Sequence, residues 1–223
     1  MVRNRRLPVR MATTPRFGIF SPLFNSASGY LALLNLGSPT TPSPLSEVLN
    51  CCRSVDNPYK EVVSLLEVSN WRPHLVAAVA ISLLRYESTS VTSLWGAFDS
   101  GSWVSPQLAA VACLRDPDFL AHARVRIAMR CPLETTKLMS LSPLQRHTAY
   151  GPAGGRQRSA KAAASLMQLV SVLRPVPEWW LKEQSSPDLV ALLSEDVDQS
   201  ARIAEQWLLQ LKAHLKTLGV ENS

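Results

Sequence analysis

The residues of this chain that could do acid–base chemistry gather around one short turn. Asp116 and Asp118 flank Pro117, and His122 follows Asp118 by four residues. This spacing lets an imidazole and a carboxylate meet on one helix face, where the carboxylate can orient the histidine for proton transfer. A helix-stabilising pair or a plain polar surface uses the same spacing. An enzyme hypothesis rests on these three side chains alone, and we favour the structural interpretation.

Metal binding and nucleophilic hydrolysis need patterns that the sequence lacks. His74, His122, His147 and His214 are isolated from one another, and the four cysteines show no Cys-x-x-Cys spacing. There is no Gly-x-Ser-x-Gly elbow for a nucleophile. We therefore expect no metal, no cofactor and no catalytic residue. The cysteines are typical of reduced, mostly buried thiols in a cytoplasmic protein.

A glycine-rich segment, Gly151 to Gly155, leads into the basic residues Arg156, Arg158 and Lys161, and a helix is expected from about Ser159 to Leu173. The N–H groups at a helix N-terminus can hold a phosphate together with such side chains. The Gly-Lys-Ser/Thr ending of a P-loop is absent. Arg156, Arg158 and Lys161 are thus candidate anion-binding residues, with a flexible linker as the alternative.

Two adjacent tryptophans, Trp179 and Trp180, are the candidate partner-binding residues. Neighbouring positions of a helix point about 100° apart, so the two indoles cannot both join one apolar stripe. Tryptophan is also enriched in the hot spots of protein interfaces. We expect at least one of the pair to cover a seam between helices or to meet a partner.

Helices must position all of these residues. The chain is 46% hydrophobic and 18% charged, which is typical of globular proteins. Its apolar residues recur at helical spacing, without the alternation of a half-buried strand. Ser or Asp followed by Pro marks helix starts at Ser105, Asp116, Ser142 and Ser186. The sequence predicts an all-α fold of short antiparallel helix pairs, arranged as a solenoid or a compact bundle.

The middle of the chain contains an internal repeat. NWRPHLVAAVA, from Asn70, is echoed by SWVSPQLAAVA, from Ser102, at a period of 33 residues. The second copy continues into an Asp-Pro-Asp turn at Asp116 and a Val-Arg pair at Val125. On these features residues 58–131 resemble HEAT-type helical repeats. The resemblance implies stacked helix pairs that hold a partner protein, and it implies no catalytic residues.

The sequence divides into three parts. Residues 1–44 are expected to be a disordered, basic, Pro/Ser-rich extension, residues 45–150 a HEAT-like helical domain, and residues 151–223 a C-terminal helical segment packing on it. Residues 1–46 carry five arginines and no acid, whereas the whole chain has a net charge of +6. Such a leader also resembles an organellar transit peptide, if the source is eukaryotic.

The last segment should contain a long helix. Apolar residues from Val197 to Leu218 recur in steps of four and three, and Gly219 should end the helix. We expect the stripe to face the protein core, with a coiled-coil seam as the alternative. The longest apolar run, Leu75 to Leu84, is too short to cross a bilayer, so no membrane span is expected.

The function expected from the sequence is that of a non-catalytic protein–protein interaction module. It would serve as an adaptor, a scaffold or an inhibitor of a partner protein that the sequence does not identify. The alternative is association with nucleic acid or a ribonucleoprotein through the basic arm and the Arg156–Lys161 loop. Binding of that kind would weaken steeply with salt, because phosphate contacts release counterions.

Overall fold

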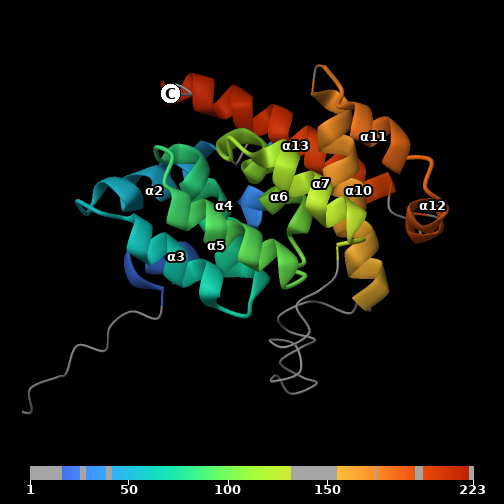
Figure 1. Cartoon of the computed structure of the whole chain (residues 1–223). Helices are drawn as coiled ribbons and strands as arrows, with labels where there is room; N and C mark the ends of the chain where they lie inside the picture. Colours follow the sequence, from blue (N-terminus) through green and yellow to red (C-terminus); the bar gives the residue numbers. More distant parts are fainter. Residues whose placement is uncertain are drawn as a thin grey trace, which may run out of the picture.

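The computed structural model describes residues 17–25, 29–38, 42–131, 155–173, 175–193 and 198–220, and every regular element in these ranges is a helix (Figure 1). The all-α fold class is therefore confirmed. The chain begins with η1 (Gly18–Phe20), α1 (Ser21–Asn25) and η2 (Tyr30–Leu34). The remaining helices are α2 (Pro42–Arg53), α3 (Tyr59–Glu67), α4 (Trp71–Leu83), α5 (Ser88–Asp99), α6 (Ser105–Arg115), α7 (Phe119–Ala128), α10 (Gly155–Val172), α11 (Glu178–Glu183), α12 (Pro187–Leu193) and α13 (Asp198–Thr217).

Polar side chains cap the first central helices. The Asn70 side chain accepts a hydrogen bond from the Arg72 N–H at 3.0 Å at the start of α4. The Glu87 carboxylate accepts bonds from Thr89 and Ser90 N–H groups at 3.0 and 2.6 Å at the start of α5. Each satisfies N–H groups that have no partner inside the helix.

The predicted Pro signals have mixed outcomes. Pro106 lies in the first turn of α6, and Pro187 begins α12, as the sequence indicates. At Asp116 the helix begins later than expected, at Phe119, and the Asp116 carboxylate accepts a hydrogen bond from the Asp118 N–H at 2.9 Å. The predicted start at Ser142 lies outside the described residues.

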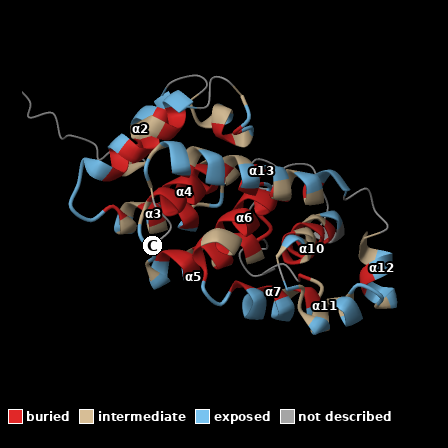
Figure 2. Cartoon of the chain, turned by 90° about the horizontal axis from the view of Figure 1, so that it is seen from above, coloured by how far each residue is buried: buried red, intermediate tan, exposed pale blue. Residues whose placement is uncertain are grey.

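The helices form layers around a central row made of α4, α6 and α10. Helices α4 and α6 pack on each other, and α6 packs on α10. Helices α3, α5 and α7 cover one side of this row, while α13 lies across α6 and α10, and α2 and η2 pack on α4. Figure 1 shows α13 in red running along one side of the molecule. Helices α4 and α6 therefore lie between two layers and are buried almost all round, as Figure 2 shows.

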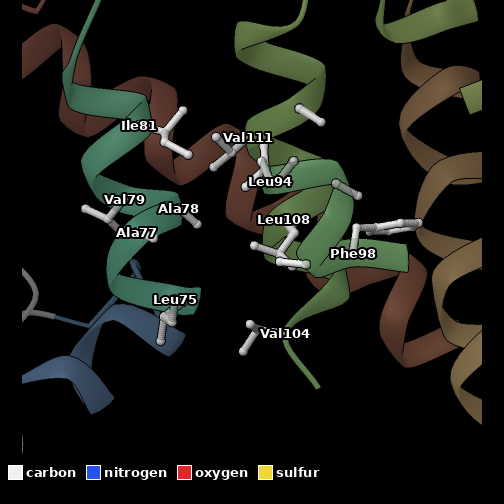
Figure 3. Close-up of a cluster of buried hydrophobic side chains, with 14 of the residues drawn as sticks. Leu75, Ala77, Ala78, Val79, Ile81, Leu94, Phe98, Val104, Leu108 and Val111 are labelled. Atoms are coloured by element: carbon white, nitrogen blue, oxygen red, sulfur yellow. The ribbon is translucent and has the colours of Figure 1, made fainter. Parts of the chain in front are cut away.

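One hydrophobic cluster extends through the molecule from Phe20 to Leu215. Its centre lies where α4, α5 and α6 meet, and Figure 3 shows Leu75 and Ala78 of α4, Leu94 of α5 and Leu108 of α6 in this region. The small residues of α4 and α6 are fully buried, which permits close approach of the neighbouring helices. The two helices that carry the repeat are therefore the centre of the fold.

The packed part of the chain begins earlier than the expected boundary at Leu45. Phe20, Leu23, Leu33 and Leu36 are at most 1% exposed and belong to the same hydrophobic cluster. Helix α2 already begins at Pro42, inside the stretch expected to belong to the disordered extension. Its prolines fit there because the first helical turn has no use for their missing N–H groups. Residues 1–16 of the expected extension lie outside the described part of the chain.

The apolar stripe of α13 faces the protein core. Ala204, Leu208, Leu211 and Leu215 are buried where α13 packs on α6 and α10, and Trp207 widens this face. Gly219 follows the helix end with a φ of +67°, a left-handed conformation that glycine adopts without strain. Residues of the expected C-terminal segment thus share one core with the helices before them.

Candidate functional site

The two adjacent tryptophans of helix α11, Trp179 and Trp180, have different surroundings. Both are half-buried and pack against the main hydrophobic cluster. The Trp180 indole N–H donates to the Met167 carbonyl of α10 at 3.2 Å, so this residue fastens α11 to α10. Trp179 lines an open pocket of about 400 Å³ with Arg124, Glu178 and Lys182. Trp180 therefore covers the contact between α11 and α10, whereas Trp179 lies at a pocket.

The end of α7 holds α11 in place from the other side. The Arg130 guanidinium donates to the Glu183 carboxylate at 3.1 Å and to the Ser186 hydroxyl at 2.7 Å. Arg130 and Cys131 both have positive φ angles, 63° and 46°, at the point where the chain leaves α7. Two helices that are distant in sequence are thereby fixed side by side.

Charge is unbalanced around Trp179. Arg124 and Lys182 are exposed, and neither forms an ion pair with any residue in the described ranges. Glu178 supplies a single negative charge to the same pocket. Apolar side chains are also exposed on these two helices, with Val125 54% and Leu181 52% exposed. The α7–α11 face, defined here as the pocket residues Arg124, Glu178, Trp179 and Lys182, thus combines an indole ring with a net positive charge.

Sequence reasoning predicted Trp179 but missed Arg124 and Lys182. Arg124 lies on α7, more than fifty residues before Trp179, and the long separation gives no local signal that they share a pocket. Lys182 follows Trp179 by three residues, and the helical spacing would have placed it on the same face. The surface became visible only through the packing of α11 on α7.

In the cluster of Asp116, Asp118 and His122, the histidine pairs with a different carboxylate from the one expected. His122 contacts Asp116, at 2.6 Å between Nδ1 and Oδ2, and makes no such bond with Asp118. Asp118 is the N-cap residue of α7, where its carbonyl accepts the His122 N–H at 3.0 Å and its side chain makes no capping hydrogen bond. Because an ionised carboxylate only accepts hydrogen bonds, His122 Nδ1 carries the proton.

Asp116 has its hydrogen-bonding capacity engaged inside the protein. It is 7% exposed and accepts bonds from His122, from the Trp95 indole N–H at 2.7 Å and from the Asp118 N–H at 2.9 Å. Burial alone would raise the pKa of Asp116, but these hydrogen bonds outweigh it and hold the pKa below its ordinary value. The carboxylate joins α5 to α7 and is a poor acceptor for a substrate proton.

A second contact joins the same two helices. The Arg126 guanidinium donates two hydrogen bonds to the Asp99 carboxylate, both at 2.7 Å. The same guanidinium lies over the Trp95 ring, 4.1 Å from its centroid. A paired and stacked arginine of this kind is held in one geometry. Polar residues around Trp95 therefore contribute to the packing of α5 on α7.

The predicted anion-binding residues are only partly described. The segment 151–154 and the side chain of Arg156 lie outside the described part of the structure. Arg158 is half-buried and already engaged within the protein. Lys161 is half-buried and lines a separate pocket of about 220 Å³ together with Trp103 and Gln107. An anion site at these residues stays a prediction.

Among the described residues there is no group of three or more His, Cys, Asp or Glu side chains that could hold a metal ion. None of the described helices combines the length and the apolar character needed to cross a membrane. Comparisons with family models, curated proteins and solved structures give no match to this chain. The resemblance of residues 58–131 to HEAT repeats therefore stays a prediction.

Proposed function

We propose that the protein is a non-catalytic protein–protein interaction module that binds an acidic partner segment at the α7–α11 face. The observation that carries this proposal is the open pocket lined by Trp179 together with the unpaired Arg124 and Lys182. An apolar side chain of the partner would pack on the indole, and neighbouring carboxylates would meet the two cations. Tryptophan and arginine are the residue types most enriched in interface hot spots.

The pocket is held in position before any partner arrives. Trp180 fastens α11 to α10, and Arg130 fastens α11 to α7 and to Ser186. A surface that is already ordered loses little conformational entropy when it binds. Trp179 therefore supplies contact area at a small entropic cost.

The polar cluster supports a non-catalytic role. The Asp116 carboxylate is occupied by three donors, and Arg126 is paired with Asp99. These contacts join helices and occupy the side chains of Asp116 and Arg126 inside the protein. An adaptor, a scaffold or an inhibitor needs a rigid helical array with an accessible face, and the α7–α11 face meets that need.

A capture experiment with tagged full-length protein tests the proposal. Nuclease-treated native lysate is passed over wild-type protein and over Trp179→Ala, and retained proteins are identified by mass spectrometry at low and high salt. Trp179→Ala should reduce capture of a stoichiometric partner by about tenfold and should lower the melting temperature less than Trp180→Ala, which also removes the bond to Met167. Trp103→Ala, which alters a 41% exposed tryptophan elsewhere, is the matched control and should retain capture.

Charge-reversal variants test whether the partner binds at the α7–α11 face or elsewhere on the protein. Arg124→Glu combined with Lys182→Glu should abolish capture of an acidic partner, since both cations that face it are reversed. Trp180→Ala should instead lower the melting temperature, because the bond to Met167 and a half-buried side chain are lost. A partner that binds all these variants equally would contradict the proposal. Capture that disappears with nuclease would favour the nucleic-acid alternative.

A further inference from the structure

The C-terminal ends of four helices meet around one pocket. Its lining includes Arg53, the last residue of α2, Leu83, the last residue of α4, and Arg115, the last residue of α6. Gly219, two residues beyond α13, completes the set. The pocket has a volume of about 450 Å³ and is further lined by Leu84, Arg85 and Val220. Such a volume lies in the range of about 300–1,000 Å³ that small-molecule sites occupy.

Three arginines therefore line a single cavity, and one of them is buried. Arg115 is 7% exposed, and one of its terminal nitrogens donates to the Ser82 carbonyl. Its Nε has no hydrogen-bond partner among the described residues. A buried cation with an unsatisfied donor is unfavourable unless a counter-charge reaches it. Arg53 and Arg85 are exposed and stand at the same pocket.

The partial negative charges of the four helix C-termini offset only part of the positive charge of the three arginines. Each helix C-terminus carries about −0.5 of an elementary charge, so four of them offset about two of the three guanidinium charges. The ion pairs among the described residues involve neither Arg53 nor Arg85 nor Arg115. Burial lowers the pKa of Arg115, because the charged guanidinium has lost contact with water. Among the described residues, a positive charge of about one unit is thus left uncompensated at the cavity.

We propose that this pocket binds a small molecule through an oxyanion group, either a phosphate or a carboxylate. Arg115 is the buried anchor, and Arg53 and Arg85 close on the anion from the exposed side. Guanidinium groups suit this role because their fork of N–H donors matches two oxygens at once. Leu83, Leu84 and Val220 offer contact to an apolar part of the same ligand. The site is independent of the α7–α11 face.

Calorimetric titration of the full-length protein tests the site. Inorganic phosphate and citrate are the two probes, each titrated at constant ionic strength against a sodium chloride control. One saturable site should appear with at least one probe, and Arg53→Gln combined with Arg85→Gln should weaken it by about tenfold or more, the loss of about 1.4 kcal/mol of binding free energy. Preference for phosphate would indicate a phosphate ester as ligand, and preference for citrate a carboxylate.

Lys60→Gln combined with Arg202→Gln is the control, since it removes the same charge from two exposed positions that do not line this pocket. Its affinity should equal that of the wild type. Arg115→Lys keeps the charge but loses the fork, and it should also weaken binding while circular dichroism stays helical. No saturable binding of either probe, or equal weakening in both double variants, would overturn the proposal. Neither result would bear on capture through Trp179.

Discussion

At the residue scale, Asp116 makes an acid-sensitive contribution to stability. Hydrogen bonds from His122, Trp95 and the Asp118 N–H hold its pKa below the unfolded value of about 3.9, despite the opposing effect of burial. Because the folded pKa is the lower one, the ionised carboxylate stabilises the protein above about pH 4. That stabilisation is lost as the pH falls through the folded pKa.

Asp116→Asn should therefore lower the free energy of unfolding by about 1–3 kcal/mol at pH 7, since an amide group would face donors that need an acceptor. Urea denaturation at pH 7, 5 and 3 measures the effect. The difference from wild type should shrink as the pH falls below about 4, where the unfolded carboxyl takes up a proton that the folded carboxyl resists. Asp118→Asn, at an exposed position, should change stability little. A difference that is constant with pH would contradict the assignment.

The cysteines give a second prediction at this scale. All four are free thiols, and burial raises the pKa of Cys52 and Cys131 to about 12 and that of Cys113 to about 11. Since the thiolate is the reactive form, these thiols should react with a disulfide reagent at pH 8 at least about a hundredfold more slowly than in urea. Stopped-flow absorbance measures both rates. Fast labelling of the native protein would show that a cysteine is accessible.

At the element scale, α4 and α6 depend on small side chains. Ala78 is fully buried, and Figure 3 places it among the side chains of the central cluster. Ala78→Leu should cost about 1–3 kcal/mol, because the added carbons have no room in a packed core. Ala213→Leu, on the exposed side of α13, is the control and should stay within about 0.5 kcal/mol.

Urea midpoints at an unchanged slope measure the two alanine variants. A wild-type midpoint for Ala78→Leu would mean that the helices around α4 are spaced more loosely than their burial indicates. A loss in both variants would instead point to an effect of leucine on helices in general. The comparison therefore tests the packing of α4 and not its helix propensity.

The sequence could predict the helices that carry periodic apolar residues and start signals, such as α4, α6 and α13. It could not predict α2 fully, because Pro42 and Pro44 in a Ser/Thr-rich stretch are equally typical of a linker. Nor could it predict η1 and η2, which are too short to show a period. The carboxylate that meets His122 was not predictable either: the helical spacing indicated Asp118, but Asp116, which lies before the start of α7, makes the contact.

At the scale of the whole molecule, the segment before α2 closes the fold against α13. The Trp207 indole N–H donates to the Leu33 carbonyl at 3.0 Å, and His214 Nε2 bonds the Leu36 carbonyl at 2.7 Å. On the other side, the Tyr30 ring lies 6.1 Å from that of Trp71, at the start of α4. Residues far apart in the chain therefore complete the same core, and no local sequence pattern predicts these contacts.

Removing residues 1–38 should consequently unfold the protein or leave it without fixed packing. Four side chains that are at most 1% exposed would be lost, each worth about 1.5–3 kcal/mol, whereas the net stability of a domain is about 5–15 kcal/mol. Removing residues 1–16 deletes none of these contacts and should leave the melting temperature within a few degrees of wild type.

Differential scanning calorimetry compares the two truncations with Trp207→Phe, which keeps a buried ring but removes the donor to Leu33. That substitution should cost about 1–3 kcal/mol, since the Leu33 carbonyl then lacks a partner. Because it acts within an intact chain, it tests the closure even if the longer truncation aggregates. A wild-type melting transition in both the 1–38 truncation and Trp207→Phe would mean that the core is complete without the segment. The expected boundary near Leu45 would then hold for stability, although the segment packs beside α13.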